Sequence, residues 1–538
     1  MLLKNHECSM KRSVLALAFA ALLGTQAGAK TLVFCSEGNP EGLNPQLVTT
    51  TTGMNATRPM FNMLVEFIPG STRIAPSLAE SWTVSDGGRE YVFRLRRGVR
   101  FHASEVFTPT RPLNADDVVF SLMRQWKKDH PYHAVSGAGY DYFQDLGMGD
   151  LLEAIEKVDD HTVRIRLTRP DAPFLANLAM MFNAIHSAEY GEAMLRLGTP
   201  ERLDREPIGT GPFVFAGYQK DVTVRYRAFD GYWGGRRPID TLVFSITPNP
   251  AVRLTKLRAG ECHVMAFPNP ADVKRIEADP TLVLLQQEGL NIGYLSLNVT
   301  KPPFGDLRVR KAMAHAVDKQ ALVDAVYQGA GVAAKNPIPP TLWSYHDGIR
   351  DEPYDLAKAR QLLAEAGYPN GFETELWYMP VSRPYNPNGK RVAEMIQTDL
   401  AKIGVRLKLV TDEWNRYRAR LQAGEAPMAL FGWTGDNGDP DNFLDVMLGC
   451  TAARVGGNNI AKWCHAEYDA LVTKAKVTAS HREREELYRR AQEVFKAETP
   501  WVPLAHSVVF MATRREVQGF RMDPLGRHDF SGVDLRPQ

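Results

Sequence analysis

The sequence lacks the residue patterns that mark metal sites and common catalytic centres. Its 538 residues contain five cysteines, and no CxxC or CxxH spacing supports a zinc site. The 13 histidines include no HxH and no i, i+4 pair. No GxSxG, HExxH or paired-carboxylate pattern appears, and the glycine cluster GTGPF precedes no phosphate-binding helix. A metal cofactor, a nucleotide-binding loop and hydrolase chemistry are therefore not expected.

The chain also lacks an excess of one charge. It has 64 basic and 62 acidic residues. Residues 1–29 hold three basic residues and one acidic residue, so the remaining chain has 61 of each. A nucleic-acid or membrane-surface partner needs a clustered basic field, so neither partner is expected.

The first thirty residues predict an export signal. Lys11 and Arg12 form a positive segment, an apolar run follows at 13–24, and Ala27-Gly28-Ala29 is a small-residue cleavage site. A membrane anchor is the alternative, but a bilayer span needs about 20 apolar residues. We therefore expect residues 1–29 to be removed and the mature chain to reside in the periplasm. No later stretch approaches a membrane span.

Four cysteines remain in the expected mature chain. An even number in an exported protein favours disulfides, because the bacterial periplasm is kept oxidising. Cys450 and Cys464 close a short loop, so we expect them to pair and leave Cys35 to pair with Cys262. Four cysteines allow three pairings, and a zinc site is the rival use. Neither Cys8 nor Cys35 lies in a lipoprotein cleavage box, so no lipid anchor is expected.

The mature length predicts at least two domains, because one hydrophobic core does not grow to this size. Strands dominate the first 290 residues, with a hairpin at 82–95 and an alternating strand from His161. Asn114 is the expected N-cap of a helix. A near-continuous apolar strand begins at Ile239.

From residue 305 the pattern changes to helices alternating with strands. The stretch 306–327 is amphipathic. Segments 355–368 and 390–404 predict helices that stop at a glycine, and a strand at 405–410 follows the second. The chain is therefore predicted to be an α/β protein of mixed strand order.

Several longer strings share their order with one protein family. They are PSLAESWTVSDGGREYVFRLRRGVRFH, NADDVVFS, IGTGPF, FDGYWGG and RVRKAMAHAVDK. Through them the chain resembles the peptide- and nickel-binding class of bacterial extracytoplasmic solute-binding proteins over essentially its whole mature length. Within that class, CSEGNPEGLNPQ, MPVSRPYNPN, GWTGDNGDPDNF and DPLGRHDF are similar to the dipeptide-binding members. Each string alone is weak evidence for the family, whereas the whole set, in the same order along the chain, is specific evidence.

The resemblance implies a type II-like periplasmic binding protein of two α/β lobes that close on a ligand about a two-strand hinge. An extra domain would be inserted into the first lobe. The expected divisions are a signal peptide at 1–29, lobe I at 30–65, the inserted domain at 66–205, lobe I again at 206–290, lobe II with the main ligand-binding loops at 291–509, and a return to lobe I at 510–538.

The resemblance also implies a function. The chain would be the monomeric substrate-binding protein of an ABC importer, with no enzyme activity and no cofactor. It would capture dipeptides and deliver them to an inner-membrane permease complex.

A receptor for any dipeptide must hold one ammonium and one carboxylate, and the planar guanidinium of arginine can pair with a carboxylate bidentately. Asp436 lies in a glycine-flanked loop after the apolar strand 428–433, and Arg383 follows a strand at 375–379. Both loops follow strands of one lobe, the side where α/β folds bind ligands. By resemblance, Asp436 binds the ammonium and Arg383 binds the carboxylate.

Further residues are expected in the ligand site beside these two. They are Thr49 from lobe I, Pro384, Tyr385, Trp433, Thr434 and Gly435. Plainer interpretations exist: Asp436 can be a turn acid that bonds its own backbone, and Arg383 can be a solvated loop charge. Trp433 can be a core residue, and Thr50 can replace Thr49 as the ligand contact.

The sequence leaves two other functions to consider. A secreted peptidase would need a nucleophile or an activated water, and no motif supplies one. A binder of the same fold could carry haem, a nickel chelate, glutathione or an oligopeptide, although both end-group partners match the dipeptide pattern. Haem as a second ligand and a chemoreceptor as a further partner stay open.

Overall fold

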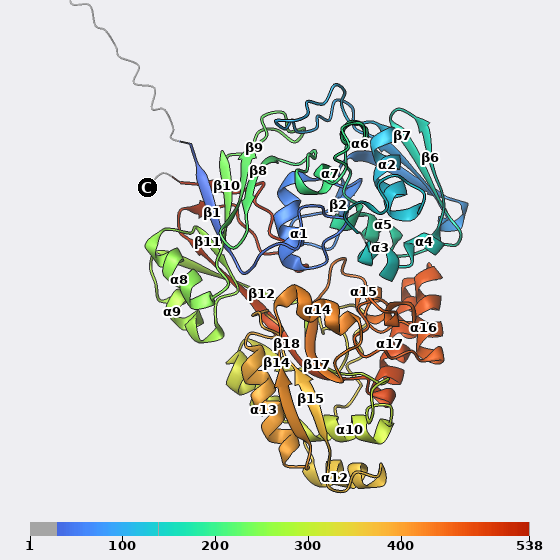
Figure 1. The fold of residues 1–538 in the computed structure, drawn as a ribbon, viewed down its shortest axis with the longest axis vertical. Helices are drawn as coiled ribbons and strands as arrows, with labels where there is room; N and C mark the ends of the chain where they lie inside the picture. Colours follow the sequence, from blue (N-terminus) through green and yellow to red (C-terminus); the bar gives the residue numbers. More distant parts are fainter. Residues whose placement is uncertain (1–28, 138, 537–538) are drawn as a thin grey trace, which may run out of the picture.

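The computed structural model describes residues 29–137 and 139–536. The predicted signal peptide, with Cys8, lies outside these residues except for Ala29. Figure 1 shows an upper part, mostly blue to green, and a lower part, mostly yellow to orange. Within the described ranges, no helix is both long enough and apolar enough to cross a membrane.

One 12-stranded sheet runs through both parts of the molecule. Its strands in the upper part are β1 (Thr31–Ser36), β8 (Phe213–Gln219), β9 (Thr223–Ala228), β10 (Thr241–Ile246), β11 (Val264–Ala266) and β12 (Leu282–Glu288). Its strands in the lower part are β13 (Asn291–Leu297), β14 (Gly331–Ala333), β15 (Glu373–Trp377), β16 (Arg406–Val410) and β17 (Met428–Thr434). The order is β16-β15-β17-β13-β18-β11-β1-β10-β9-β8, where β18 (Trp501–Arg514) also pairs with β12 and β14.

A separate four-stranded antiparallel sheet lies in the upper part. It consists of β4 (Ala79–Ser85), β5 (Glu90–Leu95), β6 (Leu152–Asp159) and β7 (Thr162–Leu167), in the order β4-β5-β7-β6. The pair β4–β5 is the predicted hairpin. Two short pairs complete the described strands, β2 (Val65–Phe67) with β3 (Ile74–Pro76) and β19 (Val517–Gln518) with β20 (Asp534–Leu535).

Helices cover the sheets on both sides of the boundary between the two parts (Figure 1). Those of the upper part are α1 (Thr51–Thr57), α2 (Ala115–Trp126), α3 (Asp141–Asp145), α4 (Met148–Leu151), α5 (Phe174–Leu178), α6 (Ala188–Arg196), α7 (Arg202–Arg205), α8 (Pro250–Ala259) and α9 (Val273–Glu277). Those of the lower part are α10 (Leu307–Ala316), α11 (Lys319–Leu322), α12 (Leu356–Glu365), α13 (Gly389–Ala401), α14 (Trp414–Gln422), α15 (Asp441–Leu444), α16 (Ala466–Val477) and α17 (His481–Glu498). Asn114 caps α2 as predicted, in a capping box with Asp117.

The amphipathic stretch 306–327 forms two helical segments instead of one. Val317 has an extended backbone (φ −89°, ψ 117°), and Asp318 then accepts a hydrogen bond from the backbone N–H of Ala321 at 3.0 Å. The helix therefore restarts at a new N-cap, which hydrophobic periodicity does not reveal.

Two chain segments connect the two parts, as the two-lobe fold requires. One is the link Gly289–Leu290 between β12 and β13, and the other is the middle of β18. The first half of β18 pairs with β13 and β14, whereas its second half pairs with β11 and β12. Buried Asn291 joins the two segments, because it donates to the backbone oxygen of Ser507 at 3.2 Å and accepts from its N–H at 3.0 Å. We call this contact the Asn291–Ser507 clamp.

The domain divisions given above stay a prediction. The four-stranded sheet falls inside the segment 66–205 that was assigned to an inserted domain. The boundary at 290/291 falls at the link between β12 and β13. The boundary at 509/510 cuts β18, a strand that both parts share.

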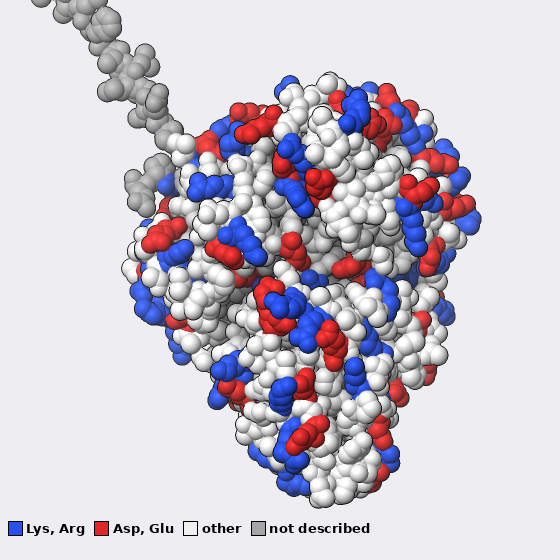
Figure 2. All heavy atoms as spheres, in the orientation of Figure 1, with Lys and Arg blue, Asp and Glu red and all other residues white. Residues whose placement is uncertain are grey.

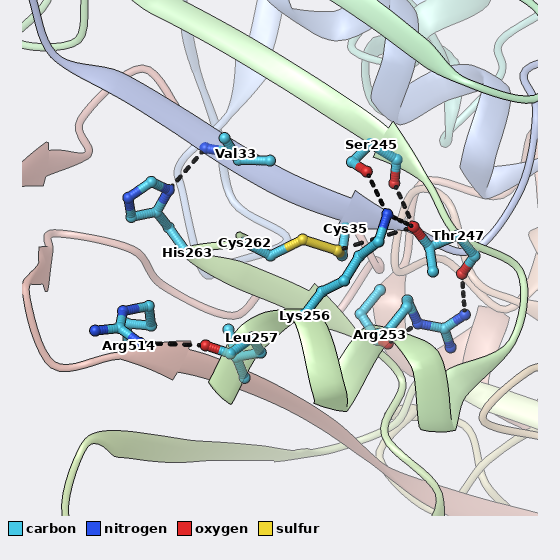
Figure 3. The surroundings of a disulfide bond; sticks show 11 residues. Val33, Cys35, Ser245, Thr247, Arg253, Lys256, Leu257, Cys262, His263 and Arg514 are labelled. Atoms are coloured by element: carbon cyan, nitrogen blue, oxygen red, sulfur yellow. Dashed lines mark hydrogen bonds between the residues drawn. A yellow bond between two sulfur atoms is a disulfide. The ribbon is translucent and has the colours of Figure 1, made fainter. Parts of the chain in front are cut away.

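The cysteines pair as predicted. Cys35 on β1 is bonded to Cys262, which precedes β11, and Cys450 is bonded to Cys464. Figure 3 shows the first bond between β1 and the end of α8. In the same region, Nδ1 of His263 accepts from the backbone N–H of Val33 at 3.0 Å. This disulfide therefore reinforces the pairing of the first strand with β11.

Candidate functional site

A cavity of about 40 Å³ lies where the upper and lower parts meet. Its lining comes from the start of α1, from α3, and from four segments of the lower part. The lining residues are Thr49, Thr50, Thr51, Tyr142, Arg383, Tyr385, Trp414, Arg418, Phe431, Gly432, Trp433, Thr434, Asp436 and Asn458. Because both parts contribute walls, movement about the connecting strands would open and close this site.

The loops that carry Arg383 and Asp436 leave the same edge of the sheet. β15 and β17 are parallel neighbours, with Leu376 opposite Met428. The loop after β15 contains a tight turn, in which Arg383 and Asn386 exchange backbone hydrogen bonds of 3.0 and 2.9 Å. Pro384 lies inside this turn, where its fixed φ is suitable.

A glycine on β17 allows this turn to approach the sheet. A Cβ on Gly432 would lie 2.2 Å from the ring of Tyr385 and 2.5 Å from the backbone oxygen of Ile292. The hydroxyl of Tyr327 donates to the backbone oxygen of Tyr385 at 2.6 Å. These contacts fix the turn, so the backbone that carries Arg383 is positioned before any ligand binds.

Asp436 is held by side chains, not by the backbone of its own loop. Its Oδ2 accepts from the hydroxyl of Tyr142 at 2.9 Å and from the side-chain amide of Asn442 at 3.3 Å. Oδ1 of Asn442 in turn accepts from the backbone N–H of Asp436 at 2.8 Å and from Nε1 of Trp433 at 3.1 Å. This arrangement differs from that of a turn acid.

The surroundings of Asp436 disfavour its ionised form. Burial raises the pKa of Asp436 to about 7, against the smaller lowering effect of the hydrogen bonds from Tyr142 and Asn442. A cation placed beside the carboxylate would remove this penalty, because an opposite charge stabilises the ionised form.

Arg383 is buried, at 6 % exposure, so it is not a solvated loop charge. Its Nη1 lies 3.4 Å from Oε1 of Glu37 in the upper part, and its Nη2 donates to Oγ1 of Thr52 at 3.2 Å. Its guanidinium also lies 5.3 Å from the ring centre of Trp414. Burial raises the pKa of Glu37, but Arg383, His528 and Thr52 together outweigh it and leave that pKa below its ordinary value.

A second arginine, which no sequence pattern indicates, also lines the cavity. Arg418 on α14 donates to Oγ1 of Thr49, and its Nη1 lies 3.5 Å from Oε1 of Glu41. Glu41 also accepts from the backbone N–H groups of Thr49 and Thr50, at 3.1 and 2.7 Å. Thr49 and Thr50 therefore both line the cavity: Thr49 is the partner of Arg418, and Thr50 caps α1.

Nor does any sequence pattern indicate Tyr142 or Asn458. Tyr142 lies on α3, within the segment assigned to the inserted domain, and no sequence pattern connects it to the loop at Asp436. Only the packing of α3 against the lower part brings the two together.

The structure brings six of the eight predicted ligand residues to the cavity. They are Thr49, Arg383, Tyr385, Trp433, Thr434 and Asp436. Pro384 and Gly435 do not line it. A Cβ on Gly435 would lie 2.6 Å from Leu290 and 2.7 Å from Phe443, so this glycine makes room for protein side chains. Ligand binding by any of the eight stays a prediction.

The arrangement suits a small zwitterion. The carboxylate of Asp436 and the guanidinium groups of Arg383 and Arg418 line the same cavity. On the outer surface, by contrast, basic and acidic side chains are interspersed over the visible face, without a large field of one sign (Figure 2).

Comparison with known proteins gives one consistent result. The family model of bacterial extracellular solute-binding proteins, family 5 (middle region), matches residues 73–454. The dipeptide-binding protein of Escherichia coli (strain K12) is 53% identical over 517 residues, which are 96% of each chain. The heme-binding protein A of Haemophilus influenzae is 51% identical over 506 residues, 94% of this chain and 92% of that protein. The crystal structure of a dipeptide binding protein from Pseudoalteromonas sp. SM9913 in complex with Met-Leu superimposes with a TM-score of 0.91 at 37% identity, covering 94% of this chain and 100% of that one.

Proposed function

The chain belongs to family 5 of the bacterial extracellular solute-binding proteins, and from this premise we propose that it captures dipeptides for an ABC importer. It is a periplasmic receptor that holds a dipeptide by its free amino and carboxyl ends. Support for this ligand comes from the dipeptide-binding relative at 53% identity and from the solved relative that holds Met-Leu.

One observation carries the assignment of the end groups: a carboxylate and a guanidinium, from neighbouring loops of one sheet edge, line the same cavity. We assign the α-ammonium to Asp436 and the α-carboxylate to Arg383. A guanidinium has five N–H donors. Contacts to Glu37 and Thr52 use two of its nitrogens, so donors remain for a ligand carboxylate.

The remaining predicted residues would complete the site. Tyr385, Trp433 and Thr434 form walls, while Pro384 and Gly435 shape the two loops. Thr49 contacts the ligand from the upper part when the lobes close. The pairs Arg383–Glu37 and Arg418–Glu41 link the two parts across the site, so ligand exchange requires both pairs to separate.

The partner that receives the dipeptide would be an inner-membrane ABC permease complex. The receptor would act as a monomer without a cofactor, after removal of residues 1–29, and it would catalyse no reaction. A chemoreceptor is a further candidate partner.

Haem is a second candidate ligand, because the heme-binding protein A of Haemophilus influenzae is 51% identical to this chain. A cavity of about 40 Å³ holds only a few water molecules, so a dipeptide already needs the lobes to move apart, and a haem macrocycle needs a much more open arrangement. The test is a titration with haem, monitored by the haem absorption spectrum, in the presence and absence of saturating Gly-Leu. Weaker haem binding in the presence of Gly-Leu indicates one shared site, whereas unchanged haem binding indicates two sites.

The test of the dipeptide assignment is calorimetric titration of Gly-Leu into the wild type and Asp436→Asn. Loss of one partner of a desolvated charge pair costs about 2–5 kcal/mol, or roughly 30- to several-thousand-fold in Kd. Asp347→Asn is the control, because the Asp347 side chain is 92% exposed in the lower part. N-acetyl-Gly-Leu should bind the wild type as weakly as Gly-Leu binds Asp436→Asn. Binding of Gly-Leu to Asp436→Asn within threefold of the wild type contradicts the assignment.

A further inference from the structure

A second cavity adjoins the proposed dipeptide site, the cavity lined by Arg383 and Asp436, and shares Asp436 and Thr51 with it. Its volume is about 20 Å³. It also shares Arg58, Phe67 and Arg527 with a third cavity of about 240 Å³ in the upper part. The second cavity therefore adjoins both the cavity that holds Asp436, the proposed ammonium partner, and this larger space.

The walls of the second cavity are mostly apolar. Met54, Met180 and Met181 line it together with Leu525. All four side chains are buried. Methionine is unbranched and fits irregular spaces, so these walls can adapt to an inserted side chain. We call this space the methionine cavity.

The charged residues of the methionine cavity are unbalanced. Apart from Asp436, its only ionisable lining residues are Arg58 and Arg527. Arg527 is paired with Asp523, with Nη2 and Oδ2 2.5 Å apart. Arg58 has no carboxylate within 4 Å among the described residues, and its buried Nε has no hydrogen-bond partner there.

Arg58 keeps its charge at neutral pH. Burial and the neighbouring Arg527 lower the pKa of Arg58 to about 10, against the opposing effect of Asp523, Asp529 and Glu66. All three acids line the larger third cavity, and none of them lines the methionine cavity. Arg58 is half-buried. A partly desolvated guanidinium without a close counter-charge is a favourable site for a carboxylate.

We propose that Arg58 selects the first side chain of the bound dipeptide, favouring an acidic side chain and disfavouring a basic one. The inference rests on the proposed function, because Asp436 holds the ammonium and so fixes the first Cα beside it. The first side chain then enters the cavity that Asp436 also lines. A glutamate passes the methionine walls and meets Arg58, whereas a lysine brings a like charge to Arg58 and Arg527.

The first experiment compares Glu-Ala, Gln-Ala, Lys-Ala and Ala-Ala on the wild type by calorimetry. Like-charge juxtaposition in a buried site is costly, so Glu-Ala should bind about tenfold or more tightly than Lys-Ala, with Gln-Ala between them. Binding of Lys-Ala as tightly as Glu-Ala overturns the proposal. If Ala-Ala does not bind either, the dipeptide assignment fails as well; if Ala-Ala binds, only the role of Arg58 is overturned.

The second experiment measures the ratio of the Kd of Gln-Ala to that of Glu-Ala in variants, so that a general change in affinity cancels. The ratio should fall to about 1 in Arg58→Gln and stay above 1 in Arg58→Lys, since only the latter keeps a cation. Arg73→Gln, at an exposed position of the upper part, should keep the wild-type ratio. A wild-type ratio in Arg58→Gln overturns the proposal. If Arg58→Gln does not fold, the comparison of the four dipeptides on the wild type still tests the proposal.

Discussion

The two residues assigned to the ligand ends differ in how far the protein already satisfies their charges. Arg383 contacts a carboxylate, a hydroxyl and an aromatic ring. Asp436 has two neutral donors and a raised pKa. Binding at the carboxyl end therefore adds a partner to an Arg383 whose charge is already balanced, whereas binding at the amino end requires Asp436 to be ionised.

Dipeptide binding should weaken as the pH falls below 7. Asp436 is mostly protonated below its pKa of about 7 and must lose that proton to pair with an ammonium. The Kd of Gly-Leu should therefore rise with falling pH between 7.5 and 5.5, approaching about tenfold per unit. Calorimetry in two buffers of different ionisation enthalpy should detect proton release on binding at pH 6.

The free energy of unfolding depends on pH in the opposite direction to dipeptide affinity. A carboxylate whose pKa is raised by folding stabilises the free protein most at low pH, and this contribution is lost as the pH rises towards 7. Asp436→Asn should abolish both trends. A wild-type Kd that stays constant from pH 5.5 to 7.5 would show that Asp436 is not the ammonium partner.

At the residue scale the sequence predicts Arg383 and Asp436 but not Arg418. The first two lie in distinctive strings after recognisable strands. Arg418 is one of three arginines at two-residue spacing on α14, so the three point to different sides of one helix. Its side chain is 12% exposed, whereas those of Arg416 and Arg420 are 69% and 36% exposed. Tertiary packing alone decides which of them faces the cavity.

At the scale of elements, local patterns predict what local physics determines. The hairpin β4–β5, the cap of α2 and the strands before both ligand loops follow from alternation and capping residues. The pairing of β18 with strands on both sides cannot be predicted from such local patterns, because its partners β11 to β13 end more than 200 residues earlier. The connection between the lobes is therefore the part of the fold that sequence patterns reveal least.

Gly289→Ala should impair this connection. A Cβ there would lie 1.9 Å from Nδ2 of Asn291 and 2.3 Å from the backbone oxygen of Ser507. The Asn291–Ser507 clamp would have to shift, so we expect a loss of about 1–3 kcal/mol in the free energy of unfolding. Dipeptide affinity should fall as well, because lobe closure depends on the same segment. Denaturant unfolding and calorimetry measure the two effects.

Gly532→Ala is the matched control, since a Cβ on Gly532 would meet no atom within 4 Å. It should change neither quantity measurably. A Gly289→Ala variant with wild-type stability and affinity would show that the clamp tolerates displacement.

At the scale of the whole molecule, the two disulfides close loops of very different length. Cys35 and Cys262 are 227 residues apart in sequence, whereas Cys450 and Cys464 are 14 apart. Closing a longer loop removes more entropy from the unfolded chain, about 3 kcal/mol for 15 residues and above 4 kcal/mol for 100 or more. The first bond should therefore contribute more to stability than the second.

Cys35→Ser/Cys262→Ser should accordingly lower the Tm more than Cys450→Ser/Cys464→Ser. Thermal unfolding of the mature protein measures both, and wild type under reducing conditions should lie below either variant. The denatured, unreduced wild type should show no free thiol and should yield four after reduction. A larger loss from the short-loop variant would exclude the chain-entropy explanation.

The position of β18 has a consequence for how the protein is made. This strand lies between β13 and β11 in the sheet, yet the ribosome reaches it only at residues 501–514 of 538. At roughly 5–20 residues per second, β13 waits on the order of 10–40 s for that neighbour. During this interval β13 and β11, the strands that flank β18 in the finished sheet, each keep an unpaired edge. The nascent chain therefore cannot complete its native core before synthesis is almost finished. If the predicted signal peptide directs export of the unfolded chain, this late strand leaves time for export before the native core forms.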